Sequence, residues 1–375
     1  MTQTKKYQRC MVFAGGGFRF GIYLGMYAAA CDAGRKPDVL LASCGGAIAA
    51  AIIQSLSSDA ERLTWLGSPE MYRFWCGLTS APHASLAATL AQAAQRKLSR
   101  RAAPLIPDLF NSYLFDVPPL LPLPPAAPNP EVDVAIVGGK LLFRPDEVGQ
   151  LRGQRKLFVQ TVLCNARAAA LLDGMPSPFE SQAWGSHAIA AGVMTDSSMS
   201  VAEAARLSIT DFYYFACHRH GGDYYVGGVV DLFPIEVAHR LADEVMLEFK
   251  ESFDQAFSIP AWRAVLGLDG NQRLRYVNAQ PGDVWFDTSD VSIALARQQV
   301  QKKIDWRRNR ITLSPPSSHA IYMQHIQDQW DYGYQRGREA LQRKSSGDMS
   351  GMRRVNRYNR PGTASSISTP HGGTA

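Results

Sequence analysis

The chain has 375 residues, of which 46% are apolar and 19% are charged, and its formal net charge is +6. These proportions exclude an intrinsically disordered protein and indicate a globular fold with a substantial core. The six cysteines are scattered and form no CxxC pair, which argues against a zinc site or a disulfide framework and favours free thiols in a reducing, cytoplasmic compartment.

The distribution of apolar and basic residues limits the possible partners. The longest apolar run, residues 39–53, is shorter than the ~20 residues of a membrane-spanning helix, and the polar residues 1–9 do not resemble a signal peptide. Residues 345–375 have the composition of a disordered basic tail. We interpret the tail as a solvated end, with attraction to anionic lipid as the alternative. No motif supports a nucleic-acid partner. We therefore expect a soluble protein with, at most, peripheral membrane contact.

The first 55 residues predict alternating strands and helices. Residues 7–14 predict a strand that ends in a glycine run, and residues 21–33 predict a helix. Residues 39–42 then predict a second strand, and residues 45–55 predict a helix of small residues. This order predicts a parallel sheet with helices on its faces.

The rest of the chain predicts further elements of the same domain, which we assign to residues 1–344. Seven prolines between residues 117 and 130 predict a stiff loop, residues 118–130, inside this domain. The basic residues 96–101 suit the negative end of a helix dipole, and a membrane-facing rim is the alternative. The sequence pattern predicts strands at residues 132–137, 157–163, 212–216 and 244–249, and helices at residues 64–101, 235–242, 291–307 and 320–343.

Cys44 lies between the second predicted strand and the helix that follows it. A side chain at the tip of such a turn is forced outward, and Gly45 and Gly46 relieve the crowding around it. The helix N-terminus is expected to lower the pKa of this thiol and to favour the thiolate at neutral pH. The alternative is a small buried apolar residue, which is our interpretation of the other five cysteines.

The glycine run at residues 15–17 follows the first predicted strand. Together with the turn at Cys44, it predicts an oxyanion hole formed by the amides of Gly16, Gly17 and Gly45. A nucleotide phosphate is the alternative ligand of a glycine loop, but neither a GxGxxG motif nor a P-loop is present. The sequence predicts neither a cofactor nor a metal ion.

Several segments of the chain resemble the patatin-like phospholipases. Gly15–Gly21, followed by Gly25, resembles the oxyanion loop of that family, and Pro37–Ala50 resembles its nucleophile elbow. The resemblance covers residues 12–341. It implies a three-layer α/β fold with a mostly parallel central sheet and helices on both faces, and acyl chemistry on lipids. Further similar segments are Arg206-Leu207-Ser208, Val226-Gly227-Gly228 with Asp231 and Pro234, and the final predicted helix with Trp330, Gly333 and Gly337.

The chain departs from the family at its reacting groups. The family uses a serine–aspartate dyad, but Cys44 stands in the place of the serine and Val226 in that of the aspartate. Phe20 and Ala42 occupy positions where glycine is usual. One hypothesis is an inactive patatin-like pseudoenzyme that serves as a lipid-binding or scaffold protein. The other is that loss of the carboxylate favours a thiolate, because a nearby negative charge would raise the thiol pKa.

The second hypothesis predicts an acyl hydrolase or acyltransferase with Cys44 as its nucleophile. Its substrate would be a lipid or an acyl thioester, such as acyl-CoA or an acyl carrier. Without a base, water would attack the thioester slowly, so transfer would be favoured over hydrolysis. Arg19 is the candidate for binding an anionic substrate group, with a structural ion pair as the alternative. The sequence does not determine the oligomeric state. Candidates for a substitute base are His218, His220, Asp223 and Asp231.

Overall fold

The computed structural model of the protein describes residues 4–15, 17–98, 104–253, 258–296, 298 and 300–345. A nine-stranded sheet lies at its centre. The strands of this sheet are β1 (Tyr7–Phe13), β2 (Val39–Ser43), β5 (Asp133–Leu141), β6 (Phe158–Cys164), β7 (Met194–Asp196), β8 (His218–His220), β9 (Asp223–Val226), β10 (Ala242–Phe249) and β11 (Val284–Asp287).

The sheet is mostly parallel. Its main path runs β11-β10-β1-β2-β5-β6-β7, with β9 paired to β5 and β8 paired to β9. The strands from β11 to β5 pair in parallel, whereas β6 and β9 run antiparallel to β5. Two small antiparallel sheets are formed by β3 (Thr79–Ser80) with β4 (Phe115–Asp116) and by β12 (Gln301–Asp305) with β13 (Arg310–Ser314).

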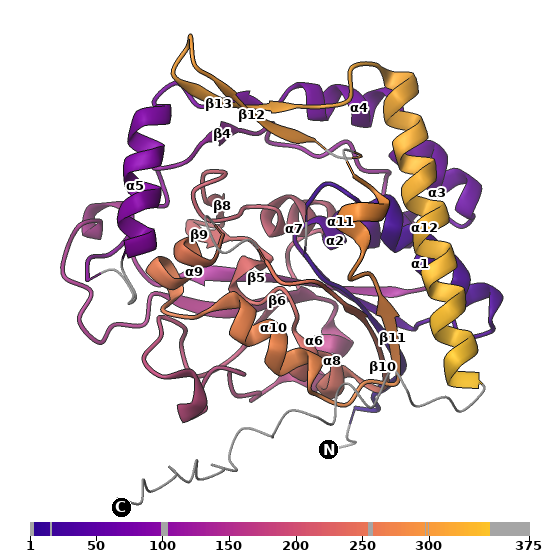
Figure 1. Cartoon of the computed structure of the whole chain (residues 1–375). Helices are drawn as coiled ribbons and strands as arrows, with labels where there is room; N and C mark the ends of the chain where they lie inside the picture. Colours follow the sequence, from indigo (N-terminus) through magenta and orange to yellow (C-terminus); the bar gives the residue numbers. More distant parts are fainter. Residues whose placement is uncertain are drawn as a thin grey trace, which may run out of the picture.

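Helices cover both faces of the central sheet (Figure 1). The α-helices are α1 (Gly21–Asp32), α2 (Gly45–Ser55), α3 (Asp59–Leu66), α4 (Pro69–Cys76), α5 (Leu86–Leu98), α6 (Ala166–Leu172), α7 (Val201–Ser208), α8 (Ile235–Leu241), α9 (Ser258–Leu266), α10 (Gly270–Asn278), α11 (Val291–Ala294) and α12 (His319–Ser345). Short 3-10 turns occur at Pro145–Glu147, Gln182–Trp184 and Gly228–Val230. Among the described helices, none has the length and apolar composition needed to cross a membrane.

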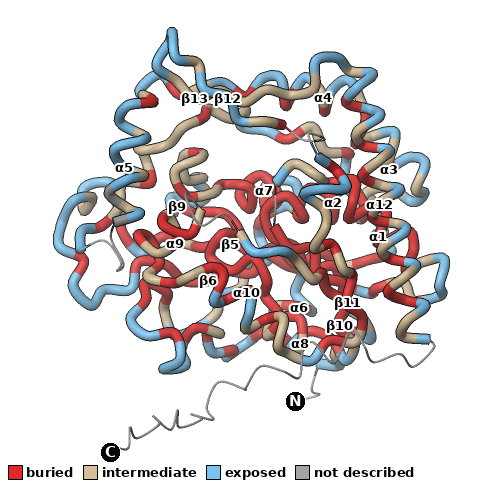
Figure 2. The backbone as a smooth tube through the Cα atoms, in the orientation of Figure 1, coloured by how far each residue is buried: buried red, intermediate tan, exposed pale blue. Residues whose placement is uncertain are grey.

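The side chains of β1 divide the core into two layers. Cys10 and Val12 belong to a hydrophobic cluster that includes α6, α8, α9 and α10. Met11 and Phe13 belong to a second cluster that includes α1, α2, α4, α7 and α12. Successive side chains of a strand point to opposite faces, so the clusters lie on the two sides of the sheet. Buried residues are concentrated in the sheet and its inner helices (Figure 2). The predicted three-layer α/β fold is confirmed.

Glycines allow α1 and α12 to pack closely. A Cβ atom at Gly25 would lie 2.1 Å from the backbone oxygen of Trp330, and one at Gly333 would lie 2.1 Å from that of Ile22. Any side chain at either position would force the two helices apart. This contact explains why the final helix carries glycine in its interior despite the unfavourable helix propensity.

Most predicted elements are present, but three predictions need correction. Residues 212–216, predicted as a strand, form a turn in which Tyr213 has a φ of 64°, a conformation that does not fit a strand. The predicted helix at residues 291–307 ends at Ala294, and the chain enters strand β12 at Gln301. The predicted helix at residues 64–101 is interrupted after Leu66 and Cys76 by glycine C-caps. The predicted tail, apart from Ser345, lies outside the described residues.

A layer that we call the cap consists of α4, α5, β3, β4, β12 and β13. In Figure 1 its strands and α4 lie at the top of the molecule, and α5 descends on the left. Hydrogen bonds join its parts: Ser80 Oγ donates to the Ile311 carbonyl at 2.7 Å, and the Leu86 N–H donates to the Asn309 carbonyl at 2.7 Å. The Tyr72 hydroxyl donates to the carbonyl of Pro316 at 2.8 Å, beyond β13. The cap is therefore one connected structure.

Candidate active site

Cys44 occupies a strained turn between β2 and α2. Its φ of 49° and ψ of −124° are uncommon for a residue other than glycine, and such strain concentrates at functional sites. Close packing also requires glycine nearby: a Cβ atom at Gly46 would lie 2.3 Å from the Phe13 carbonyl oxygen. Ser208 fixes the turn, because its hydroxyl accepts the Cys44 N–H at 2.9 Å and donates to the Val137 carbonyl at 2.7 Å.

A carboxylate lies beside the Cys44 thiol. The thiol donates a hydrogen bond to Asp211 Oδ2, with a sulfur–oxygen distance of 3.7 Å. Asp211 is three residues beyond the end of α7. Its other oxygen, Oδ1, is buried and has no hydrogen-bond partner among the described residues. The Asp211 carboxylate is therefore free to accept a proton from this thiol.

The carboxylate comes from a different segment than the one around Val226, where the resemblance to the family places the aspartate. The Gly227 N–H donates to the Thr210 carbonyl at 2.7 Å, which joins the two segments. Asp211 follows Thr210, and Val226 precedes Gly227, so the two positions flank the same contact. Val226 is 2% exposed and belongs to the hydrophobic core. A carboxylate therefore lies beside the thiol although position 226 carries a valine.

The environment shifts the pKa values of both groups upward. Burial raises the pKa of Asp211 to about 7, against the opposing effects of the Cys44 hydrogen bond and the Lys302 charge. Burial and the negative charge of Asp211 raise the pKa of the Cys44 thiol well above its usual range. The Gly45 N–H at the helix N-terminus acts in the opposite direction but does not prevail. The prediction of a lowered thiol pKa is therefore wrong, because it considered the helix N-terminus but neither the burial of the thiol nor the charge of Asp211.

The glycine loop packs against the turn at Cys44. A Cβ atom at Gly15 would lie 2.9 Å from that of Cys44, and one at Gly45 would lie 2.8 Å from the Gly17 carbonyl oxygen. Lys250 holds the loop, because its ammonium group donates to the Gly15 carbonyl at 3.0 Å and pairs with Glu248 at 3.1 Å. The loop and the elbow are therefore neighbours, as the proposed oxyanion hole requires. Gly16 lies outside the described residues.

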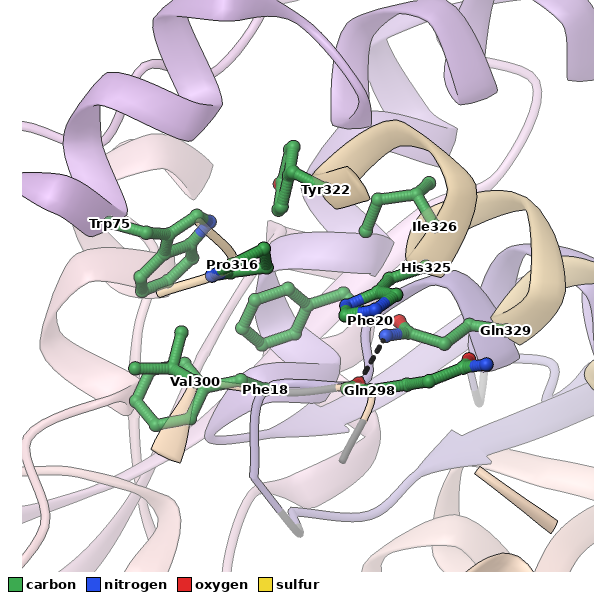
Figure 3. A pocket seen from close by; sticks show the side chains of 10 residues that line it. All are labelled: Phe18, Phe20, Trp75, Gln298, Val300, Pro316, Tyr322, His325, Ile326 and Gln329. Carbon is green, nitrogen blue, oxygen red and sulfur yellow. Dashed lines mark hydrogen bonds between the residues drawn. The ribbon is translucent and has the colours of Figure 1, made fainter. Parts of the chain in front are cut away.

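Phe20 contacts the elbow and also lines a small cavity. Its ring contacts Gly45, where a Cβ atom would lie 2.7 Å from Phe20 Cε1, and it stacks on Trp75 with ring centroids 5.1 Å apart. The ring also lines a cavity of about 10 Å³, together with Trp75, Tyr322 and His325 (Figure 3). That volume holds about one water molecule. Phe20 therefore fills space next to the elbow that glycine would leave open.

The candidate bases predicted from the sequence are engaged with other groups. His218 and His220 bond to Glu203, at 3.3 and 2.8 Å, and Asp223 pairs with Lys140 at 2.6 Å. Asp231 is 2% exposed and forms an ion pair with the Arg273 guanidinium, with a nitrogen–oxygen distance of 2.9 Å. None of these described contacts involves the Cys44 thiol. Arg19 donates to the Leu295 carbonyl at 3.4 Å, and burial lowers the pKa of its guanidinium.

Sequence reasoning missed three groups at this site: Asp211, Ser208 as a support of the elbow, and Lys250. Asp211 carried a signal, because it is the acidic residue of the otherwise neutral run Ser208–Phe215, directly after a segment that resembles the family. Lys250 follows a predicted strand, but nothing in the local pattern connects it with Gly15. Among the described residues, no cluster of three or more His, Cys, Asp or Glu side chains could hold a metal ion.

Comparison with known sequences agrees with this geometry. Residues 11–239, more than half of the chain, match the patatin-like phospholipase family. The comparison with curated proteins gives no significant match. The family match includes the glycine loop, the turn at Cys44 and the segments that carry Asp211 and Val226. The chain therefore belongs to the patatin-like phospholipase family.

Proposed function

We propose that the protein is an acyl hydrolase or acyltransferase in which Cys44 is the nucleophile and Asp211 the proton acceptor. The observation that carries this proposal is the 3.7 Å contact between the thiol and a carboxylate whose Oδ1 has no partner among the described residues. The family acts on lipids, which makes lipid esters the first substrate class to test. Acyl thioesters, such as acyl-CoA or an acyl carrier, are the second class.

The reaction begins with the thiol protonated and Asp211 ionised. As Sγ attacks the acyl carbon, its proton moves to Asp211, and the carbonyl oxygen becomes an oxyanion. We assign the stabilisation of this oxyanion to the amides of Gly16, Gly17 and Gly45. Collapse of the tetrahedral intermediate expels the alcohol or thiol, which takes the proton from Asp211 and leaves a thioester on Cys44.

Release of the acyl group uses the same base. Asp211 accepts a proton from water or from another acceptor as it attacks the thioester, and returns that proton to the departing sulfur. The preference for transfer over hydrolysis was predicted for a site without a base, and Asp211 removes this premise. We therefore assign no preference between the two acceptors. Arg19 remains the candidate for an anionic substrate group, because its Nε atom has no partner among the described residues.

A catalytically inactive lipid-binding protein is the second candidate. It is favoured by the tight packing around the elbow, where Cys44 is 8% exposed and the neighbouring cavity holds about one water molecule. In this case the protein would bind lipids but would form no covalent adduct.

Mass spectrometry after incubation with p-nitrophenyl acyl esters and acyl-CoA distinguishes the candidates. We expect an acyl adduct on the Cys44 peptide that is released by hydroxylamine, as a thioester should be. Cys44→Ala should abolish it. Cys164→Ala is the matched control, because Cys164 is also 8% exposed but bonds to a backbone carbonyl, that of Val162 at 3.6 Å. Lipid binding without an adduct, or full turnover by Cys44→Ala, would contradict the proposed mechanism.

A further inference from the structure

The β12–β13 hairpin of the cap exposes large apolar side chains to solvent. Trp306, in the turn, is 73% exposed, and Ile304 in β12 is 47% exposed. The turn projects from the top of the molecule, far from α8 and β10 (Figure 1), and its residues are exposed (Figure 2). Tryptophan in such a position is typical of side chains that insert at a membrane–water interface.

The hairpin also carries a strong positive charge. Within residues 301–314 there are five cations and one anion, Asp305. Arg308 lies 3.9 Å from Asp305, too far for a strong ion pair, and is 82% exposed. The excess of cations around an exposed tryptophan complements an anionic lipid surface. The cations are Lys302, Lys303, Arg307, Arg308 and Arg310.

The turn is fixed to the cap and does not depend on a partner for its shape. Asn309 adopts a φ of 51° and accepts the N–H groups of Leu86 and Ala87, at 2.7 and 3.2 Å, at the beginning of α5. Its side-chain amide also donates to Ser85 at 3.3 Å. The basic and aromatic side chains are thus displayed from a braced base, which lowers the entropy lost on binding.

The same layer lies over the segment that carries Asp211. Lys302 contacts the Tyr214 hydroxyl and lies 4.3 Å from the centre of its ring. Arg96 of α5 lies 3.5 Å from the centre of the Tyr213 ring. Both tyrosines follow Asp211 within three residues. The cap thus contacts the segment that carries Asp211. A lipid surface bound to the hairpin would lie on this same side of the molecule.

We propose that the β12–β13 hairpin is the surface by which the protein docks on anionic membranes. Trp306 inserts at the interface, and Arg307 and Arg308 contact lipid phosphates. This inference rests on the proposed function only in that the membrane supplies the lipid substrate. Binding itself requires no chemistry at Cys44.

Flotation of the full-length protein with vesicles tests the proposal. We expect binding to phosphatidylcholine vesicles that contain phosphatidylserine and much weaker binding to phosphatidylcholine alone. Arg307→Gln/Arg308→Gln should lower the partition coefficient roughly tenfold or more, and Trp306→Ser should lower it severalfold. The matched control is Arg144→Gln/Arg275→Gln, which removes the same charge at exposed positions outside the hairpin. It should leave the partition coefficient within about twofold of the wild-type value.

Further measurements distinguish a failure of the docking proposal from a failure of the proposed function. Cys44→Ala should bind vesicles like the wild type, so a defect in chemistry is distinguishable from a defect in docking. The hairpin variants should hydrolyse a water-soluble ester at the wild-type rate.

Three outcomes would overturn the proposal. The first is equal vesicle binding by the hairpin variants and the wild type, and the second is an equal loss of binding in the Arg144→Gln/Arg275→Gln control. The third is hairpin-dependent binding to nucleic acid without binding to vesicles. If vesicle binding is lost only when Arg353, Arg354, Arg357 and Arg360 are replaced with glutamine, docking belongs to the tail and not to the hairpin.

Discussion

Asp211 and Asp231 are two acidic residues near the elbow with opposite surroundings. Arg273 donates to both carboxylate oxygens of Asp231, at 3.1 and 2.9 Å, and Gln160 donates to one of them at 3.3 Å. Asp211 faces the Cys44 thiol and keeps one oxygen without a partner among the described residues. Burial raises the pKa of both carboxyl groups, but at Asp231 the Arg273 guanidinium opposes this effect and favours the ionised form. Asp211 bonds to a neutral thiol instead, and its pKa is raised to about 7, so it can gain a proton. We infer that the groups paired with a carboxylate indicate whether it can act as a base better than its position in a motif does.

The largest effect is expected for Asp211→Asn. Asparagine has a similar shape but cannot accept the thiol proton, so the rate of acylation at Cys44 should fall by about 10²- to 10⁴-fold. Stopped-flow or quenched mass spectrometry with an activated ester measures this rate. The circular dichroism spectrum should remain that of the wild type. Wild-type acylation by Asp211→Asn would show that the carboxylate is not the proton acceptor.

Asp231→Asn should lower the free energy of unfolding. Arg273 would lose one of its two acidic partners while keeping Glu236, at 2.6 Å. Breaking such a buried pair costs about 3 kcal/mol, and urea denaturation measures that loss. The acylation rate of the folded protein should change far less than in Asp211→Asn. A variant that keeps wild-type stability but loses acylation would reverse the roles assigned to the two residues.

The two aspartates also show what the sequence could and could not predict. The layer order, the turn at Cys44 and its glycines follow from local pattern, because strand–turn–helix geometry is encoded by neighbouring residues. Asp211 could not be assigned in this way. Its approach to Cys44 depends on a contact between Thr210 and Gly227, which local sequence does not reveal. Asp231 was a candidate because it flanks the altered loop at Val226, and its partner Arg273 is 42 residues away.

Asp211 should also make the stability of the protein depend on pH. The pKa of Asp211 is raised to about 7 in the folded protein, compared with about 3.9 in an unfolded chain. The folded state therefore binds more protons between these values, and its free energy of unfolding decreases as the pH rises through about 7. Asp211→Asn removes this contribution. In denaturation experiments, it should be more stable relative to the wild type at pH 8 than at pH 5, by about 1–2 kcal/mol after allowance for solvent screening. A difference that does not change with pH would contradict the raised pKa.

The smallest effect is expected at Phe20. Phe20→Leu removes the ring that stacks on Trp75 and contacts Gly45, and should lower the free energy of unfolding by about 1 kcal/mol. The space released beside the elbow should shift the preference among ester substrates toward longer acyl chains by roughly threefold to tenfold. Phe18→Leu is the control, because Phe18 lines the same cavity but is not among the closest contacts of Gly45. Equal chain-length profiles for both variants and the wild type would remove Phe20 from substrate selection.

The pH dependence of acylation at Cys44 is the decisive test of whether Asp211 accepts the thiol proton. If Asp211 accepts the thiol proton, the single-turnover rate of the wild type should rise with pH to a plateau, with a midpoint near 7, where Asp211 ionises. In Asp211→Asn the plateau should be absent, and the rate should rise only at higher pH, with ionisation of the thiol itself. Superimposable profiles for the two proteins would show that Asp211 is not the proton acceptor, and no acylation of Cys44 at any pH would show that Cys44 is not the nucleophile.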